Sequence, residues 1–412
     1  MPELGRFKRK RRVRRAVVKK KTAITPRPSE RRLGRTSLDF YGLRSEISNE
    51  MQKPLDMPLI LITGMLLIIG LISLLSASYP QSYYKENIST YYYFTRQLAM
   101  AAIGTVAMIG SSCIPYQKYK EHSWTLYVIS VILLILVKTP LGKTVNNARR
   151  WLFGFQPSEI AKLALIVIFA AVVSRNPQSV KSFRGLTRYI VLLGVLVLLL
   201  ALEPHMSAAM IMCVVGFTIL FVAGMHMWFM IPLSIAGVVG SIASYFIFAH
   251  IRARVNVYLD PFIDATGDGW QAVQSHIAIG SGGLLGLGAG QSRQKFLYLP
   301  EPMNDFIFSV ICEEIGFIGA ILIMMLFAYF IYRGFSIARR SPDRFSCLVA
   351  TGITMQFAFQ ILLNLAVVTG LFPVTGASLP LFSYGGTALL MQMFEIGILL
   401  NISRNIPPSR KQ

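Results

Sequence analysis

The stretch KFLYLPEPMNDFIFSVICEEIGFIG, residues 295–319, changes character within a few residues. It begins with the prolines and polar residues of a loop and ends as the start of an apolar helix. Asp305 stands at the boundary, and Glu313 and Glu314 follow inside the apolar part. Ionisable side chains within a membrane span are costly and usually face an interior cavity. We therefore expect a membrane helix to begin here, beside a polar site.

The composition of the whole chain also indicates a membrane protein. The 412 residues are 54% hydrophobic and only 15% charged, with a mean hydropathy of +0.54. A soluble protein of this length carries more charge on its surface. We therefore predict an all-α integral membrane protein.

Apolar stretches long enough to cross a bilayer as helices set the number of spans. We predict about ten transmembrane helices, although the third stretch is short and only EPHM separates the fifth from the sixth. The predicted ranges are 58–79, 95–114, 124–138, 157–173, 189–203, 207–224, 228–249, 306–332, 346–370 and 380–402.

Basic residues orient these spans, because Lys and Arg are retained on the cytoplasmic side. The prediction is a membrane protein with both termini in the cytoplasm and a large extracellular loop, about 250–305, between spans seven and eight. The chain then divides into a basic arm (1–57), a polytopic membrane domain (58–404) and a short cytoplasmic tail (405–412).

The basic arm holds 17 of the 41 Lys and Arg residues and 6 of the 19 acidic ones, so its charge of +11 is half of the net +22. It contains no apolar run, which excludes a signal peptide. We expect a disordered tail that meets anionic lipid headgroups. An arm that binds nucleic acid is the alternative, and we do not favour it.

Two predicted outer loops carry basic residues that oppose the orientation rule. Because such residues need another purpose, an anionic ligand at the outer face is the simplest explanation, although long loops also tolerate charge. The residues are Lys138, Lys143, Arg149 and Arg150 in the first loop, and Arg252, Arg254, Arg293 and Lys295 in the second.

The second of these loops is rich in glycine at residues 280–290. A nucleotide-binding turn is rejected because no strand precedes the glycines. The apolar residues of the loop favour short helices on the outer membrane face. The glycines would allow the backbone to approach a ligand or a neighbouring helix closely.

Polar residues also recur inside the predicted spans. Glu159 and Lys162 are three residues apart on one helix face, as an internal ion pair or a ligand site would require. Asp305, Ser309 and Glu313 share a face of the eighth span. Other polar residues are Gln356, Gln360 and Asn364, which interhelical hydrogen bonds would explain, and Ser383 and Glu395 in the tenth span.

Metal-ligand patterns are missing from the sequence. The four cysteines lie singly in apolar segments, which is typical of small buried side chains. The five histidines form no zinc motif. We expect no metal site built from the protein alone.

At these residues the sequence resembles the SEDS family, the shape, elongation, division and sporulation proteins typified by FtsW, RodA and SpoVE. The resemblance covers roughly 55–404 and is carried by ARRWLFGFQPSEIAK, the long segment from QAVQSHIAIG to EEIGFIG, and FPVTGASLPLFSYGGTALLMQMFEIGILLNISR. EPHMSAAM and the NISR ending favour the FtsW/SpoVE branch. Asn147 and Met303 depart from the family pattern, where Gly and His are common.

The resemblance implies a peptidoglycan glycosyltransferase that polymerises lipid II for cell division or sporulation, beside a class B penicillin-binding protein and other division proteins. It makes Asp305, in the DFIF motif, the catalytic carboxylate. Glu159, Lys162 and Ser383 match further motif positions and are expected to bind substrate.

Glycosyl transfer from a pyrophosphate-linked donor gives these residues their roles. The leaving group needs charge neutralisation more than protonation, so a second carboxylate is not required. Asp305 would act as general base on the acceptor hydroxyl. Cations would stabilise the departing undecaprenyl pyrophosphate, with a divalent ion such as Mg²⁺ or Mn²⁺ as an alternative. The candidate cations are Arg149, Arg150, Lys162, Arg293 and Lys295.

Two alternatives remain at this point. A lipid II flippase would use the same polar cavity and basic rim, but it needs a polar path to the inner face. A membrane scaffold that only recruits a transpeptidase gives no reason for carboxylates and outer arginines together. We favour the enzyme.

Overall fold

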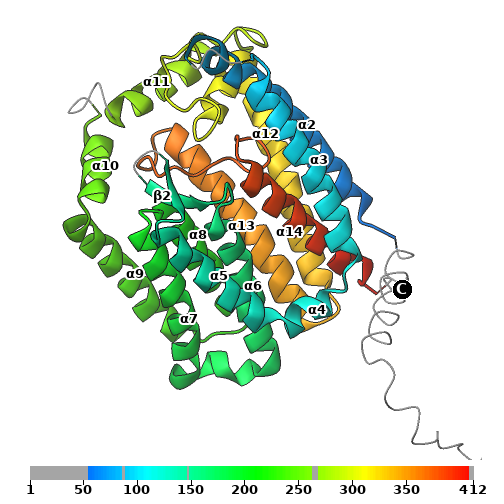
Figure 1. The fold of residues 1–412 in the computed structure, drawn as a ribbon. Coiled ribbons are helices and arrows are strands. Elements are labelled where there is room, and N and C mark those ends of the chain that lie inside the picture. The colour runs from blue at the N-terminus through cyan, green and yellow to red at the C-terminus, as the bar shows by residue number, and fades with distance from the viewer. Residues whose placement is uncertain (1–53, 86–88, 146–147, 262–267, 408–412) are drawn as a thin grey trace, which may run out of the picture. The chain divides into compact units, whose positions relative to one another are not determined.

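Helices dominate the computed structural model of this chain, which describes residues 54–85, 89–145, 148–261 and 268–407 (Figure 1). The basic arm predicted at 1–57 lies almost entirely outside the described residues, and so do residues 408–412 of the tail predicted at 405–412.

A helix lies at every one of the ten predicted ranges. These helices are α2 (Met57–Pro80), α3 (Tyr92–Cys113), α5 (Ser123–Lys138), α6 (Pro157–Arg175), α7 (Phe183–Leu202), α8 (Met206–Val222), α9 (Met227–Ile247), α12 (Ile307–Arg340), α13 (Arg344–Val368) and α14 (Gly386–Arg404).

Six helices of the described residues are long and apolar enough to cross a membrane: α2, α6, α7, α12, α13 and α14. A bent pair formed by parts of α9 and α10 raises this number to seven, and α5 and α8 are shorter apolar helices. The multi-pass character is therefore confirmed, whereas the count of ten stays a prediction.

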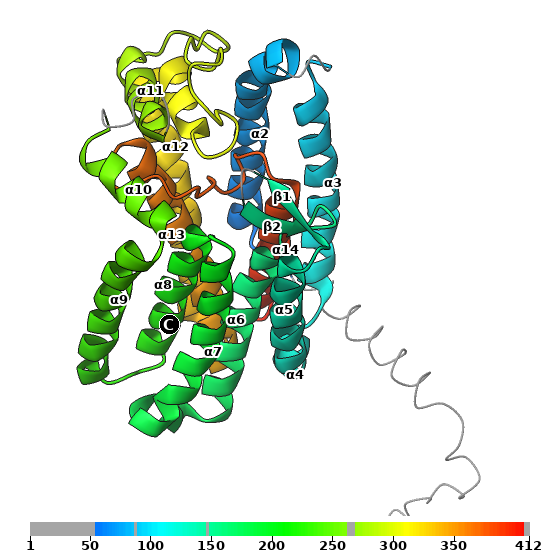
Figure 2. The same cartoon turned by 60° about the vertical axis from the view of Figure 1, so that its left-hand side comes forward.

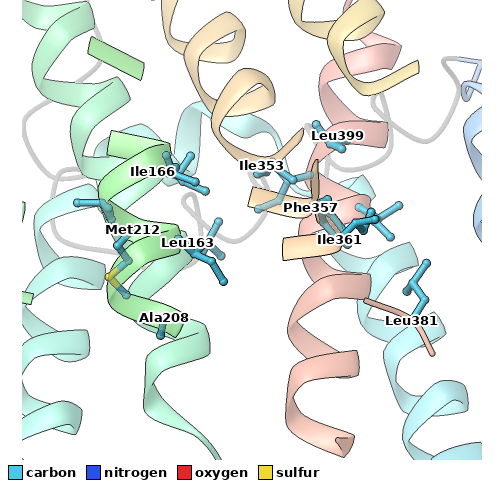
Figure 3. Packing of buried hydrophobic residues seen from close by; sticks show 14 of the residues in the cluster. Leu163, Ile166, Ala208, Met212, Ile353, Phe357, Ile361, Leu381 and Leu399 are labelled. Atoms are coloured by element: carbon cyan, nitrogen blue, oxygen red, sulfur yellow. The ribbon is translucent and has the colours of Figure 1, made fainter. Parts of the chain in front are cut away.

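The centre of the bundle is α6, which packs against α5, α8 and α13. Its residues from Ala161 to Val173 are all buried, as expected for a helix that is apolar on every side. Figure 3 shows Leu163 and Ile166 in this core, together with Met212 of α8 and Ile353 and Phe357 of α13.

Local signals in the sequence fix where several helices begin. The Asp343 carboxylate accepts a hydrogen bond from the Ser346 backbone N–H at 2.8 Å, and the Ser346 hydroxyl oxygen accepts one from the Asp343 N–H at 3.3 Å. This reciprocal cap starts α13. The Asp56 carboxylate caps α2 in the same manner, from the Leu59 N–H at 3.0 Å.

Two short strands, β1 (Gly142–Val145) and β2 (Ala148–Leu152), pair antiparallel between α5 and α6. The hairpin brings the predicted Arg149 and Arg150 toward the end of the bundle opposite to α4 (Tyr116–Glu121), as Figures 1 and 2 show. The remaining short elements are η2 (Gln81–Lys85) and η3 (Pro177–Lys181).

The predicted loop 250–305 contains the expected short helices, α10 (Ala249–Leu259) and α11 (Asp268–Ser281). The chain turns by 99° between Gly237–Ile247 and Ile251–Leu259. In both views α9 and α10 lie at the edge of the bundle (Figures 1 and 2).

The glycine-rich segment after α11 docks on a break in α12. Gly316 has φ 70° and ψ −173°, which interrupts the helix. The freed Glu313 and Glu314 carbonyls accept hydrogen bonds from the N–H groups of Leu287 and Gly288, both at 3.0 Å. The glycines therefore serve close approach to a neighbouring helix, one of the two predicted uses.

Three predicted boundaries are wrong. The helix of the fifth span begins at Phe183 rather than at 189. The tenth span begins at Gly386 rather than at 380, because residues 373–385 are held in an irregular path that includes Pro380 and a left-handed Gly376. The eighth helix continues to Arg340, beyond the predicted end at 332.

Candidate active site

Asp305 lies two residues before α12, half-buried, where the chain is held from two sides. The Asn364 side-chain amide of α13 donates to the Asp305 backbone carbonyl and to the Ala377 carbonyl, both at 2.7 Å. Asn364 is fully buried. Its position means that one amide fixes the Asp305 segment against the segment before α14.

Ser383 supports the same segment from the other side. Its hydroxyl donates to the Asn304 carbonyl at 2.6 Å and accepts from the Leu379 N–H at 2.7 Å. The Tyr384 N–H donates to the Met303 carbonyl at 2.8 Å. The buried Ser383 hydroxyl is bonded on both sides and positions the backbone next to Asp305, while its role toward substrate stays a prediction.

The surroundings of Asp305 favour its protonated form. Burial and, to a lesser degree, the Glu301 carboxylate raise the pKa of the Asp305 carboxyl from 3.8 to about 6, while Arg254 and Arg150 act to lower it. A carboxyl group with a pKa near the working pH is well suited to accept a proton in catalysis.

Arg150 of β2 lies near Asp305 and is anchored to the loop between α7 and α8. Its guanidinium donates to the Glu203 carbonyl at 3.3 Å and also to the Pro204 carbonyl. Burial lowers the pKa of Arg150, and Arg254 lowers it further, whereas Asp305 and Glu203 raise it. Arg150 and Arg254 thus both act on the single Asp305 carboxylate. One negative charge does not balance two positive charges, so positive charge remains for an anion.

Arg149, its neighbour, is exposed and donates from its guanidinium to the Thr144 hydroxyl at 3.2 Å. Adjacent residues of a strand point to opposite faces. Arg149 and Arg150 therefore lie in different surroundings, although the sequence analysis assigned both the same role as candidate cations.

Arg254, Glu203 and His205 are site residues that our assignment from the sequence missed. Burial raises the pKa of Glu203 to about 7, and burial with the nearby Arg150 and Lys162 lowers that of His205 well below its usual value. Glu203 and His205 could have been found from the sequence, because they belong to the polar EPH segment between two apolar spans. Arg254 was noticed as one basic residue of the long loop, with nothing to separate it from the others.

Glu159 and Lys162 form the internal ion pair, with Lys162 Nζ 2.9 Å from the Glu159 carboxylate. Lys162 Nζ also lies 3.3 Å from Gln360 Oε1. Both charged side chains are buried. Lys162 therefore has protein partners on two sides.

Lys295 differs from the prediction of an exposed cation. Its ammonium group lies 2.8 Å from the Glu314 carboxylate, 2.8 Å from the Ser76 hydroxyl and 2.7 Å from the Gly290 carbonyl. All three of its N–H donors are used. Lys295 thus forms a buried ion pair with Glu314, and its role in neutralising the leaving group stays a prediction.

Arg293 remains exposed on the same segment. Its backbone N–H donates to the Glu313 carboxylate at 2.9 Å, which also accepts from the Ser292 hydroxyl at 2.5 Å and from the Gln294 N–H at 3.3 Å. Glu313 and Glu314 thus fasten the loop to α12.

The Lys295–Glu314 pair also lines a cavity of about 530 Å³. Its other walls are apolar side chains of α2 and α12, with Tyr79 and Phe296. Asp305 does not line this cavity, so the cavity and the candidate catalytic group lie at different places.

Within the part of the chain that the structure describes, no group of three or more His, Cys, Asp or Glu side chains could hold a metal ion. Asp305 and Glu301 are the two carboxylates that act on each other at the site. Mg²⁺ commonly binds one or two carboxylates together with substrate phosphates. Asp305 and Glu301 are the residues that would hold a divalent cation together with substrate phosphates.

Comparison with known proteins agrees with this arrangement. Residues 57–407 match the sequence model of the FtsW/RodA/SpoVE family, described as cell cycle protein. Stage V sporulation protein E of Bacillus subtilis is 40% identical over 357 residues, which cover 85% of this chain and 97% of that protein. The probable peptidoglycan glycosyltransferase FtsW of Trichlorobacter lovleyi is 38% identical, covering 85% and 93%.

Solved structures share the fold. A chain from a peptidoglycan synthase complex, described as coordinating polymerization and crosslinking, matches with a TM-score of 0.73 and 25% identity over 86% of this chain and 99% of that chain. The rod shape determining protein RodA of Thermus thermophilus matches with a TM-score of 0.61 and 25% identity, covering 85% and 97%. The chain thus belongs to the FtsW/RodA/SpoVE family of cell cycle proteins.

Proposed function

We propose that this protein is a peptidoglycan glycosyltransferase that polymerises lipid II, with Asp305 as the general base. The proposal rests on the surroundings of the half-buried Asp305 carboxyl. Asn364 holds the Asp305 backbone, and the positive charges of Arg150 and Arg254 act to lower the pKa of its carboxyl group. The printed names of several relatives, probable peptidoglycan glycosyltransferase, support the same reaction.

In this reaction the Asp305 carboxylate accepts the proton of the sugar hydroxyl on the acceptor lipid II. The hydroxyl oxygen then bonds to the anomeric carbon of the donor sugar as the bond from that carbon to the pyrophosphate oxygen breaks. Undecaprenyl pyrophosphate leaves with the electron pair. A positioned base contributes a factor of about 10²–10⁴ to such a step.

Arg150 and Arg254 are the residues best placed to neutralise the departing pyrophosphate, because both act on Asp305. Arg149 and Arg293 are exposed and offer further positive charge at the rim. Preorganised cations stabilise charge that develops in the transition state. A divalent cation held by Asp305 and Glu301 with the phosphates would supply the same neutralisation.

The test is polymerisation of labelled lipid II in detergent by the purified protein with its penicillin-binding partner. We expect Asp305→Asn to abolish detectable glycan strands while the protein remains folded. Glu121→Gln, an exposed carboxylate on α4, is the matched control and should polymerise normally. Glycan formation by well-folded Asp305→Asn would exclude the general-base role and favour the flippase, since no membrane crossing is needed in detergent.

The class B penicillin-binding protein is proposed as partner because a structural relative is a chain of a peptidoglycan synthase complex. We further propose that both termini are cytoplasmic and that residues 250–305 face outward. A cysteine at Leu285, whose side chain is 80% exposed, should react with an impermeant reagent in intact cells lacking the four native cysteines. Reaction only after permeabilisation would reverse the orientation.

A further inference from the structure

Glu395 is a carboxyl group in the interior of the bundle that the proposed reaction does not use. It lies in the middle of α14, and its side chain is 1% exposed. Its Oε2 accepts a hydrogen bond from the Gln356 side-chain amide of α13 at 2.8 Å. Gln356 is also buried, at 2% exposure.

The second oxygen of each group has no partner. Both Glu395 Oε1 and Gln356 Oε1 are buried, and neither receives a hydrogen bond. As an ionised carboxylate and an amide carbonyl, both atoms are acceptors only. The Glu395 and Gln356 side chains are already joined by one hydrogen bond, so a single donor between their two remaining oxygens would pair both atoms. Without that donor, two buried polar atoms stay unpaired, which is costly in an apolar interior.

Among the residues that the structure describes, no cation forms an ion pair with Glu395. Lys162 of α6 is the cation that acts on it, but Lys162 is bonded to Glu159 at 2.9 Å and to Gln360 at 3.3 Å. The other charged residues of the described helices that pack against α14 lie near helix ends or have their own partners. They are Arg96, Lys118, Lys120, Glu121, Arg175, Glu313, Glu314, Arg333, Arg339, Arg340 and Arg344.

We propose that the Glu395 carboxyl group carries a proton and forms a two-bond carboxylic acid–carboxamide pair with Gln356. The acid hydroxyl, Oε1–H, donates to Gln356 Oε1, while the Gln356 Nε2–H donates to Glu395 Oε2. The proton supplies the one missing donor and partners both unpaired oxygens. It also removes an isolated charge from the membrane interior, where it would be costly.

The pair anchors a column of polar side chains on α13. Gln360, one turn from Gln356, donates to the Ser378 carbonyl at 3.0 Å. Asn364, one turn further, holds the Asp305 carbonyl. Glu395 is therefore a positioning residue that fixes α13 to α14 below the site. This link to catalysis rests on the proposed function, whereas the protonated pair does not.

Infrared spectroscopy of the purified full-length protein tests the pair without measuring activity. At pH 7 the difference between wild type and Glu395→Gln should contain the C=O stretch of a protonated carboxylic acid, present only in the wild type. Loss of carboxylate bands instead would mean that Glu395 is ionised, and would overturn the proposal.

Thermal unfolding gives a second readout. Glu395→Gln replaces the acid hydroxyl by an N–H that makes the same bond, so its Tm should equal that of the wild type. A rise in Tm would indicate removal of a buried charge and contradict the pair. Glu395→Leu should lower the Tm, because both Gln356 groups lose their partners.

The exchanged variant, Gln356→Glu with Glu395→Gln, places the acid on α13 and the amide on α14. We expect it to restore the protonated-acid band, the Tm and, if the proposed reaction holds, the kcat lost in Glu395→Leu. Failure to restore the band and the Tm would refute the pair. Restored band and Tm without polymerisation in any variant, wild type included, would refute only the proposed function.

Discussion

Asn364 and Asp305, 59 residues apart in the sequence, are joined by a hydrogen bond from the Asn364 amide to the Asp305 backbone carbonyl at 2.7 Å. The bond leaves the Asp305 carboxylate free while fixing the chain that carries it. The polar residues Gln360 and Asn364 of α13 have a common role, because both donate to backbone carbonyls of the segment before α14.

Replacement of Asn364 by Leu should therefore reduce kcat for lipid II polymerisation by at least about tenfold, since a small misplacement of a reacting group is costly in rate. The unpaired carbonyls of Asp305 and Ala377 should also lower stability by about 1–3 kcal/mol. Thr369→Val, an exposed position at the end of α13, is the control and should change neither quantity. Normal kcat in Asn364→Leu would show that the bond does not position the carboxylate.

The pH dependence of polymerisation should follow the Asp305 carboxyl. A general base must be ionised, so kcat/KM should fall as the pH drops through about 6, the raised pKa of this group. Glu301→Gln removes a negative neighbour that raises this pKa and should move the acid limb to lower pH. Arg254→Gln should move it to higher pH. Identical profiles for all three proteins would assign the acid limb to another group.

The Lys295–Glu314 ion pair should contribute to stability rather than to turnover. Glu314→Gln leaves the Lys295 ammonium buried without a counter-ion, which typically costs about 3–5 kcal/mol. Glu121→Gln breaks the exposed Lys118–Glu121 pair, 3.8 Å apart, and should change stability by less than about 1 kcal/mol. Thermal unfolding in detergent compares the two variants, and equal effects would contradict the burial of Lys295.

The break in α12 should not tolerate a side chain. A Cβ at Gly316 would lie 2.2 Å from the Gly286 nitrogen, and the φ of Gly316 is 70°. Gly316→Ala should therefore destabilise the protein by more than the roughly 1–2 kcal/mol of the left-handed conformation alone. Gly64→Ala on α2, with open space around it, is the matched control. Wild-type expression and Tm of Gly316→Ala would show that α12 can continue through this point.

The helices could be predicted from the sequence because each is an uninterrupted apolar stretch, and a helix occurs at every predicted range. The boundary near 380 could not, since the segment before α14 is apolar but held irregular by Asn364, Gln360 and Ser383 from distant parts of the chain. Hydropathy contains no information about such contacts.

The site shows the same division. Asp305 and Arg150 were predicted and do act on each other. Lys295 and Arg254 are both basic residues of one loop, and only the folding of that loop against α12 buries Lys295 and leaves Arg254 near Asp305. Residue type and spacing are equivalent for these two cations, so the structure was needed to separate them.

The two buried ion pairs differ in when they can form during biogenesis. Glu159 and Lys162 are one helical turn apart in α6, so they neutralise each other as soon as the helix forms, and the bilayer receives an uncharged segment. Lys295 and Glu314 belong to the loop and to α12 and become neutral only when the loop folds onto that helix. Charge compensation in α6 is therefore local to one helix, whereas that of the Glu314 carboxylate in α12 depends on the folding of the glycine-rich loop.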